Sequence, residues 1–200
     1  MKKTTLFITT AAIIAALYVV LTFLANAFGL ANYAIQVRFS ECLTILPLFT
    51  PAAIPGVFLG CLISNILMGS VIQDIIFGSL TTLVCAVITY LIGLAFRKAI
   101  SKANSKKVKT GLGVTGTVLG SIPPIVGNML VVPLILIYAY KFTDPIVFMG
   151  EEHASVNFIY WFYVITVGIG ELISCTVLGL IVSFIMRRTG LDLKLSGIRK

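Results

Sequence analysis

Long apolar runs, separated by short polar or basic segments, dominate the chain. Four of them, at about 4–28, 74–96, 112–140 and 157–186, are long enough to cross a bilayer core of about 30 Å as helices, which takes roughly 20 residues. Two shorter runs, 42–50 and 53–68, flank a turn with Pro51 and Pro55, which lack backbone donors and break a helix. The stretch 80–94 does not alternate with period two, as a membrane β-strand would. This pattern predicts an all-α membrane protein with six transmembrane helices, forming a single domain over residues 1–200.

Two details of the pattern lead to local expectations. The adjacent Pro123 and Pro124 predict an interruption of the fifth helix, and the six basic residues between 97 and 109 predict a loop. The segment 141–156 is polar and predicts a solvated loop that contains Glu151, Glu152 and His153. The first apolar run exceeds the roughly 7–15 residues of a signal-peptide core, so we expect it to remain as the first helix.

Composition supports the membrane assignment. The 200 residues are 58% hydrophobic and 11% charged, and the mean hydropathy is +1.07. Soluble domains are about 45–50% apolar and about 25% charged. The four cysteines lie in apolar segments without a CxxC pair, which is typical of small buried side chains and not of a metal or disulfide site.

The distribution of charge predicts the topology. The net charge is +8, and all of the 15 basic residues except Arg38 and Lys141 lie at the N-terminus, between 97 and 109, or from Arg187 onward. With six spans these three regions share one side, which the positive-inside rule assigns to the cytoplasm together with both termini. All acidic residues except Asp192 then lie on or toward the outer side, which that rule does not explain. Because the positive charge reports topology, we expect no nucleic-acid partner.

Three polar residues within or beside the apolar runs are candidates for ligand binding. Glu171 lies in an uncharged run, roughly 24 Å of helix before Arg187, and a carboxylate at that depth usually marks a ligand or ion path. The alternative is a protonated or structurally paired acid. Asn128 lies at a similar depth and could either bind a ligand or cap a broken helix. Asp74 begins the fourth helix, where an acid also stabilises a helix N-terminus without any further role.

A second group of candidates lies toward the outer side. Arg38 and Glu41 are three residues apart and either pair at the surface or contact a ligand. Aromatic and polar residues of the interfacial segments are equally ambiguous, because membrane interfaces are rich in aromatic side chains. The ligand-binding candidates of this group are Tyr33, Gln36, Phe77, Tyr160 and Trp161.

Small residues in the first helix suggest close helix packing. Ala11, Ala12, Ala15 and Ala16 form two overlapping AxxxA pairs, a spacing that lets two helices approach closely. The partner helix lies either within this chain or in another subunit.

The run QVRFSECLTILPLFTPAAIPG at 36–56, followed by DIIFGSL at 74–80, resembles the QueT family. These proteins are substrate-binding S components of energy-coupling factor (ECF) transporters for queuosine precursors. The resemblance implies an S-component bundle of six helices in a bacterial plasma membrane, with an outward-facing pocket closed by the loop after the first helix. It implies a deazaguanine ligand such as queuine or its aminomethyl precursor. It also implies that the four alanines dock on a membrane coupling subunit, which carries two ATPase subunits.

Other functional classes receive less support. The chain has no GxxxxGK[ST], GxSxG or HExxH motif, so we expect no enzymatic activity, no cofactor and no metal site. The main alternative is a stand-alone secondary transporter for a small organic cation or base, in which Glu171 carries the proton. A scaffold protein without a ligand is the third possibility.

Overall fold

The computed structural model describes residues 3–30 and 37–195 and is almost entirely helical. Four helical stretches are long and apolar enough to cross a membrane, namely Lys3–Ala27, Asp74–Lys102, Lys106–Tyr138 and Val156–Thr189. They correspond to α1 (Lys3–Ala27), to η2 (Asp74–Gly78) with α3 (Ser79–Lys102), to α4 (Lys106–Tyr138), and to α5 (Val156–Glu171), η3 (Leu172–Leu178) and α6 (Gly179–Thr189). Two shorter apolar helices are η1 (Phe39–Leu48) and α2 (Ala53–Leu67). The predicted helical membrane fold is therefore confirmed, with four helices of full span length.

The 3₁₀ helix η1, which is ten residues long, lies at the centre of the molecule. Every residue from Ser40 to Leu48 is buried, and Ile45 is completely inaccessible. Its last residue, Leu48, packs against Gly93 of α3 and Gly120 of α4, where a Cβ atom would lie within 2.8 Å of Leu48 atoms. A 3₁₀ run of this length is uncommon. It is stabilised here by packing against six helical segments, namely α1, α2, α3, α4, η3 and α6.

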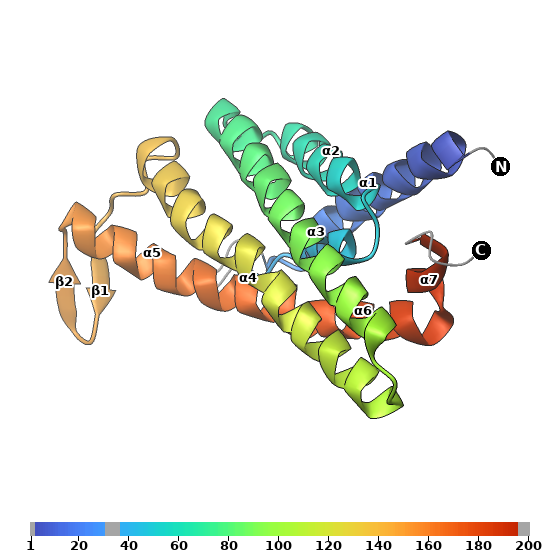
Figure 1. Cartoon of the computed structure of the whole chain (residues 1–200). Helices are drawn as coiled ribbons and strands as arrows, with labels where there is room; N and C mark the ends of the chain where they lie inside the picture. The colour runs from blue at the N-terminus through green and yellow to red at the C-terminus, as the bar shows by residue number, and fades with distance from the viewer. Residues whose placement is uncertain (1–2, 31–36, 196–200) are drawn as a thin grey trace.

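Helices α1 and α2 pack side by side (Figure 1) through small residues. A Cβ atom on Gly56 would lie 3.0 Å from the Ala11 carbonyl oxygen, and one on Gly60 would lie 2.5 Å from Tyr18 Cβ. Ala11 and Ala15 are buried in this contact, whereas Ala12 and Ala16 remain exposed. One of the two AxxxA pairs therefore packs inside the chain, and only Ala12 and Ala16 are available to another subunit.

Helix α4 is continuous through Pro123, Pro124 and Pro133, so the predicted interruption is wrong. Proline at 124 removes the backbone donor that would pair with the carbonyl of Gly120. The Thr89 hydroxyl of α3 donates to that carbonyl at 2.9 Å, and the Cys85 thiol donates to the Pro123 carbonyl at 3.2 Å. A side chain of the neighbouring helix thus satisfies the carbonyl that Pro124 leaves without its backbone donor, as membrane helices require.

Two predicted loops also differ from the structure. Helix α3 extends to Lys102 and α4 begins at Lys106, so most of the basic segment is helical, because lysine and arginine are good helix formers. The segment after α4 contains an antiparallel hairpin of β1 (Ile146–Phe148) and β2 (Glu151–His153). Its turn at Met149 and Gly150 has positive φ at both residues, which is the geometry of a tight hairpin turn. A five-residue helix, α7 (Leu191–Leu195), ends the described chain.

Two of the spans contain π-helical segments next to acidic residues. Asp74 is the first residue of η2, and Glu171 is the last residue before η3. Wider π turns inside helices occur frequently at functional sites because they redirect side chains. These irregular turns point to the region between η1, α4 and η3 as a candidate site.

Candidate functional site

A buried polar cluster joins α1, η1, η2, α4 and η3 near the middle of the bundle. We define the cluster by its members, which are the half-buried Arg38 and the buried Tyr18, Glu41, Asp74, Asn128, Glu171 and Cys175. Its three acidic side chains are buried, with exposed fractions of 1% for Glu41, 7% for Asp74 and 5% for Glu171. Buried acids are rare without specific partners, so each contact matters.

Glu41 is held from two sides. The Tyr18 hydroxyl donates to Glu41 Oε1 at 2.5 Å, across α1 and η1. The Thr44 hydroxyl donates to the Glu41 backbone carbonyl at 2.6 Å. Glu41 Oε2 is buried and has no hydrogen-bond partner among the described residues. An unpaired buried carboxylate oxygen is costly, so this atom is a natural acceptor for a ligand N–H group.

Glu171 accepts one hydrogen bond at each carboxylate oxygen. Asn128 Nδ2 donates to Oε1 at 3.0 Å, and the Cys175 thiol donates to Oε2 at 3.1 Å. Cys175 lies four residues after Glu171 on the same helical face. Since the thiol is a weak donor, a ligand N–H could replace it at little cost.

Arg38 supplies the positive charge of the cluster. Its guanidinium lies within electrostatic range of the Asp74, Glu41 and Glu171 carboxylates. Its backbone N–H donates to Ser174 Oγ at 3.2 Å, which fixes the start of η1 against η3. With three acids and one arginine, the cluster favours a ligand rich in N–H donors or carrying positive charge.

Asp74 extends the cluster toward the end of α4. The Tyr140 hydroxyl donates to Asp74 Oδ2 at 3.2 Å, and Asn65 Nδ2 donates to the Asp74 carbonyl at 3.5 Å. A Cβ atom on Gly78 would lie 2.9 Å from Asp74 Oδ1, so the glycine leaves room for the carboxylate.

Three ligand atoms of the cluster could also hold a metal ion. Single ligand atoms of Glu41, Glu171 and Cys175 lie within 4.8 Å of one another. A carboxylate–thiolate set of this kind suits a borderline-soft divalent ion such as zinc. The nearby Arg38 charge disfavours a metal ion, and Tyr18 and Asn128 already donate to two of the carboxylate oxygens. An organic ligand whose N–H groups bind the carboxylates therefore fits the cluster better than a metal ion.

The structure brings together only part of the predicted site. Arg38, Glu41, Asp74, Asn128 and Glu171 gather in the polar cluster. The aromatic candidates do not. Trp161 and Phe77 are 59% and 55% exposed, and Tyr160 is half-buried and donates to the Leu130 carbonyl at 3.4 Å. Tyr33 and Gln36 lie outside the described residues.

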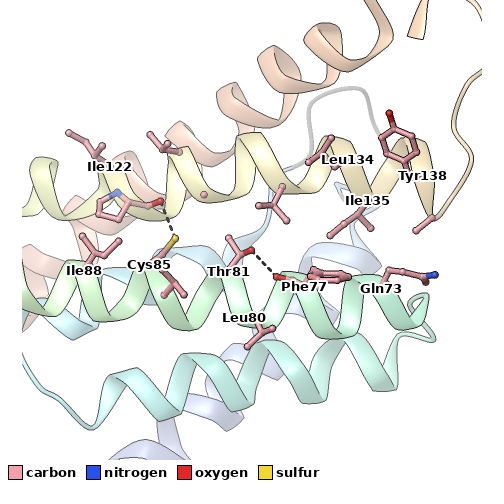
Figure 2. Close-up of a pocket in the computed structure, with 16 residues that line it drawn as sticks. Gln73, Phe77, Leu80, Thr81, Cys85, Ile88, Ile122, Leu134, Ile135 and Tyr138 are labelled. Carbon is pink, nitrogen blue, oxygen red and sulfur yellow. Dashed lines mark hydrogen bonds between the residues drawn. The ribbon is translucent and has the colours of Figure 1, made fainter. Parts of the chain in front are cut away.

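A large cavity lies apart from the polar cluster. It is an apolar groove of about 1000 Å³ between α3 and α4, and Figure 2 shows it with Phe77 and Tyr138 on its wall. Gln73 lies at one end of the groove, and Ile88 and Ile122 lie toward the other. Because it lacks charged groups, this groove is a poor site for a polar ligand.

The sequence did not predict three residues of this region. Tyr18 and Cys175 belong to the cluster, and Tyr140 contacts it through Asp74. Tyr18 follows the buried Ala11 and Ile14 at helical spacing, and Cys175 follows Glu171 by one turn, so periodicity could have identified both. Tyr140 lies beyond the end of α4, and no sequence signal places it next to Asp74.

Comparison with known proteins gives one match. A protein-family model described as QueT transporter matches residues 8–188 of the chain. Searches of curated proteins and of solved structures found no match.

Proposed function

Because the chain belongs to the QueT transporter family, we propose that it is the substrate-binding membrane subunit of an ECF-type importer and captures a queuosine precursor from outside. The observation that carries this proposal is the buried polar cluster, in which three acids and an asparagine converge inside a membrane protein. The chain itself has no ATPase role in this proposal. A membrane coupling subunit and two ATPases supply the energy.

The proposal includes six passes through the plasma membrane. Helices η1 and α2 are short, about 20 Å and 22 Å long at 2.0 and 1.5 Å per residue. In this proposal η1 forms the second pass and α2 the third. Helix η1 ends at Leu48, next to Arg97 of α3, and α2 then runs parallel to α1. Both termini and the basic helix ends are then cytoplasmic, and the hairpin of β1 and β2 is outside.

The cluster matches the chemistry of a deazaguanine. A guanine-like edge presents adjacent N–H donors, which suit a carboxylate that accepts two hydrogen bonds. Glu171 already accepts an N–H and an S–H at its two oxygens, so it is positioned for that edge. The free Glu41 Oε2 and the Asp74 carboxylate are available to a cationic aminomethyl arm. Arg38 can donate to the carbonyl oxygen of the base.

Binding to purified protein tests this assignment. Isothermal titration with queuine and its aminomethyl precursor should give saturable binding without turnover. Glu171→Gln and Glu41→Gln should each weaken binding roughly tenfold or more, because a hydrogen bond to a charged group contributes about 1.5–3 kcal/mol.

The matched control is Glu152→Gln, which removes the same charge from the exposed hairpin and should leave affinity unchanged. Chelator should also leave affinity unchanged, since no metal takes part in the proposed binding. Absence of binding by the wild-type protein, or equal affinity in Glu171→Gln and wild type, would reject the assignment.

The burial of Glu171 favours one alternative, a proton-coupled secondary transporter of a small organic cation or base. In that case Glu171 alternates between protonated and ionised forms during transport. Proteoliposomes that contain only this chain separate the two functions. Uptake driven by a pH gradient without the ATPase module would support the alternative and exclude the importer subunit.

A further inference from the structure

A second polar site lies at the end of the bundle opposite the hairpin, where α3, α4, α6 and α7 meet. It is a cavity of about 280 Å³ lined by the basic residues Arg97, Lys109 and Arg187 and by one acid, Asp192. The formal charge of these groups is positive, and the buried polar cluster plays no part in the cavity.

The two arginines are held in place by the bundle. Arg97 donates from Nη1 to the Leu48 carbonyl, and its guanidinium carbon lies 5.3 Å from the Tyr90 ring centroid. Arg187 donates from Nε to Ser183 Oγ and from Nη2 to the Gly113 carbonyl, both at 3.4 Å.

Both guanidinium groups keep spare donors. Each has five N–H groups, so one or two protein contacts leave most of them available at the cavity. The planar fork matches phosphate oxygens, and Lys109 adds an exposed point charge. These features describe a site built for a phosphate group.

Apart from Ser101, the rest of the lining is apolar or glycine. Phe49, Phe96 and Ile100 line the same cavity, and the Phe49 ring centroid lies 5.1 Å from the Arg187 guanidinium carbon. A cavity of this size is slightly smaller than the roughly 300–1,000 Å³ of ligand pockets. It suits a headgroup whose acyl chains continue into the bilayer along apolar side chains, and basic pockets between helices on the cytoplasmic side bind anionic lipids.

We propose that this cavity binds the phosphate headgroup of an anionic phospholipid of the cytoplasmic leaflet. The Asp192 carboxylate lies close enough to Arg187 to interact with it electrostatically, and its Oδ1 has no hydrogen-bond partner in the described part of the chain. Asp192 therefore competes with the lipid for the arginine. The proposal uses the cytoplasmic location of the basic helix ends but not the identity of the transported molecule.

Thermal unfolding of the purified full chain in detergent, with added phosphatidylglycerol or phosphatidylcholine, tests the proposal. A ligand that binds only the folded state raises the melting temperature with concentration. Phosphatidylglycerol should stabilise the wild-type protein more than phosphatidylcholine. Lys109→Gln should weaken its apparent affinity roughly fivefold, equivalent to about 1 kcal/mol per basic residue. Asp192→Asn should strengthen it.

Control variants separate this site from general surface charge. Lys98→Gln and Arg188→Gln remove exposed basic side chains close in sequence to Arg97 and Arg187, and should respond to phosphatidylglycerol like wild type. The double variant Arg97→Gln/Arg187→Gln should lose the response. If the double variant fails to fold, Lys109→Gln and Asp192→Asn still test the proposal. Neither side chain makes a hydrogen bond within the described chain, so neither substitution should disturb folding.

Four results would overturn the proposal. One is an equal response to both lipids. Another is an equal loss in Lys98→Gln and Lys109→Gln, which indicates non-specific charge attraction. The third is full stabilisation by millimolar inorganic phosphate alone, which would assign the cavity to a free anion. The fourth is an unchanged response in all cavity variants. This result would reject the lipid and favour an acidic segment of a protein partner as the ligand of the basic cavity.

Discussion

At the scale of single residues, the hydrogen bond between Tyr18 and Glu41 connects the first helix to the central one. Removing its donor by Tyr18→Phe leaves a buried carboxylate with neither oxygen paired. We expect this to destabilise the protein by about 1–3 kcal/mol, the cost of an unsatisfied buried polar group. Thermal unfolding in detergent measures the loss.

The control for this change is Tyr138→Phe, because the Tyr138 side chain is 72% exposed. It should have the melting temperature of wild type. If Tyr18→Phe were equally stable, Glu41 would not depend on the tyrosine hydroxyl. A saturating deazaguanine should restore part of the lost stability, because its N–H groups replace the missing donor.

At the scale of helices, close packing of α1 on α2 depends on glycine. Gly60→Ala places a methyl group 2.5 Å from Tyr18 Cβ, and overpacking of this kind costs about 1–3 kcal/mol. It should also displace Tyr18 and weaken ligand binding.

Gly111→Ala is the matched control, because its new Cβ meets no atom within 4 Å. The control should be neutral or stabilising by up to about 1 kcal/mol, the difference in helix propensity. Equal melting temperatures for the two variants would contradict this account.

The other face of α1 presents Ala12 and Ala16 to the surroundings. If the coupling subunit docks there, Ala12→Leu/Ala16→Leu should abolish uptake by the assembled transporter and leave ligand affinity of the isolated chain unchanged. Ile13→Leu, on a neighbouring exposed position, should transport normally. Normal uptake by the double leucine variant would place the docking surface elsewhere.

At the scale of the whole molecule, the proposed topology makes opposite ends of the bundle accessible from opposite sides of the membrane. The four native cysteines are buried, so they give little background to a thiol reagent. A membrane-impermeant maleimide added to intact cells should label Met149→Cys, since Met149 is 91% exposed at the hairpin turn. It should label Ser105→Cys, between α3 and α4, only after permeabilisation. Labelling of Ser105→Cys in intact cells would reverse the orientation.

The apolar pattern by itself determined that the chain is a helical membrane protein, because lipid leaves few alternatives to helices for runs of this length. The same reasoning was wrong at Pro123 and Pro124, where the helix continues and the Thr89 hydroxyl, from a different helix, satisfies the Gly120 carbonyl that Pro124 frees. The predicted loop at the basic segment was also wrong. Charged residues end the part of a helix that lies in the membrane, but the helix itself can continue beyond it.

The candidate site was likewise predicted only in part from the sequence. Sequence identified Glu171, Asn128, Glu41, Asp74 and Arg38, because charged and amide groups beside apolar runs are expensive and therefore informative. Aromatic residues carry no such penalty at a membrane interface, so the sequence could not tell that Trp161 and Phe77 are exposed.

Only the tertiary structure decided which polar groups meet. Residues as distant as Tyr18 and Glu41, or Asn128 and Glu171, form hydrogen bonds because η1 lies buried between α1, α4 and η3. A helical repeat relates residues three or four positions apart, and contacts between helices depend on how those helices pack.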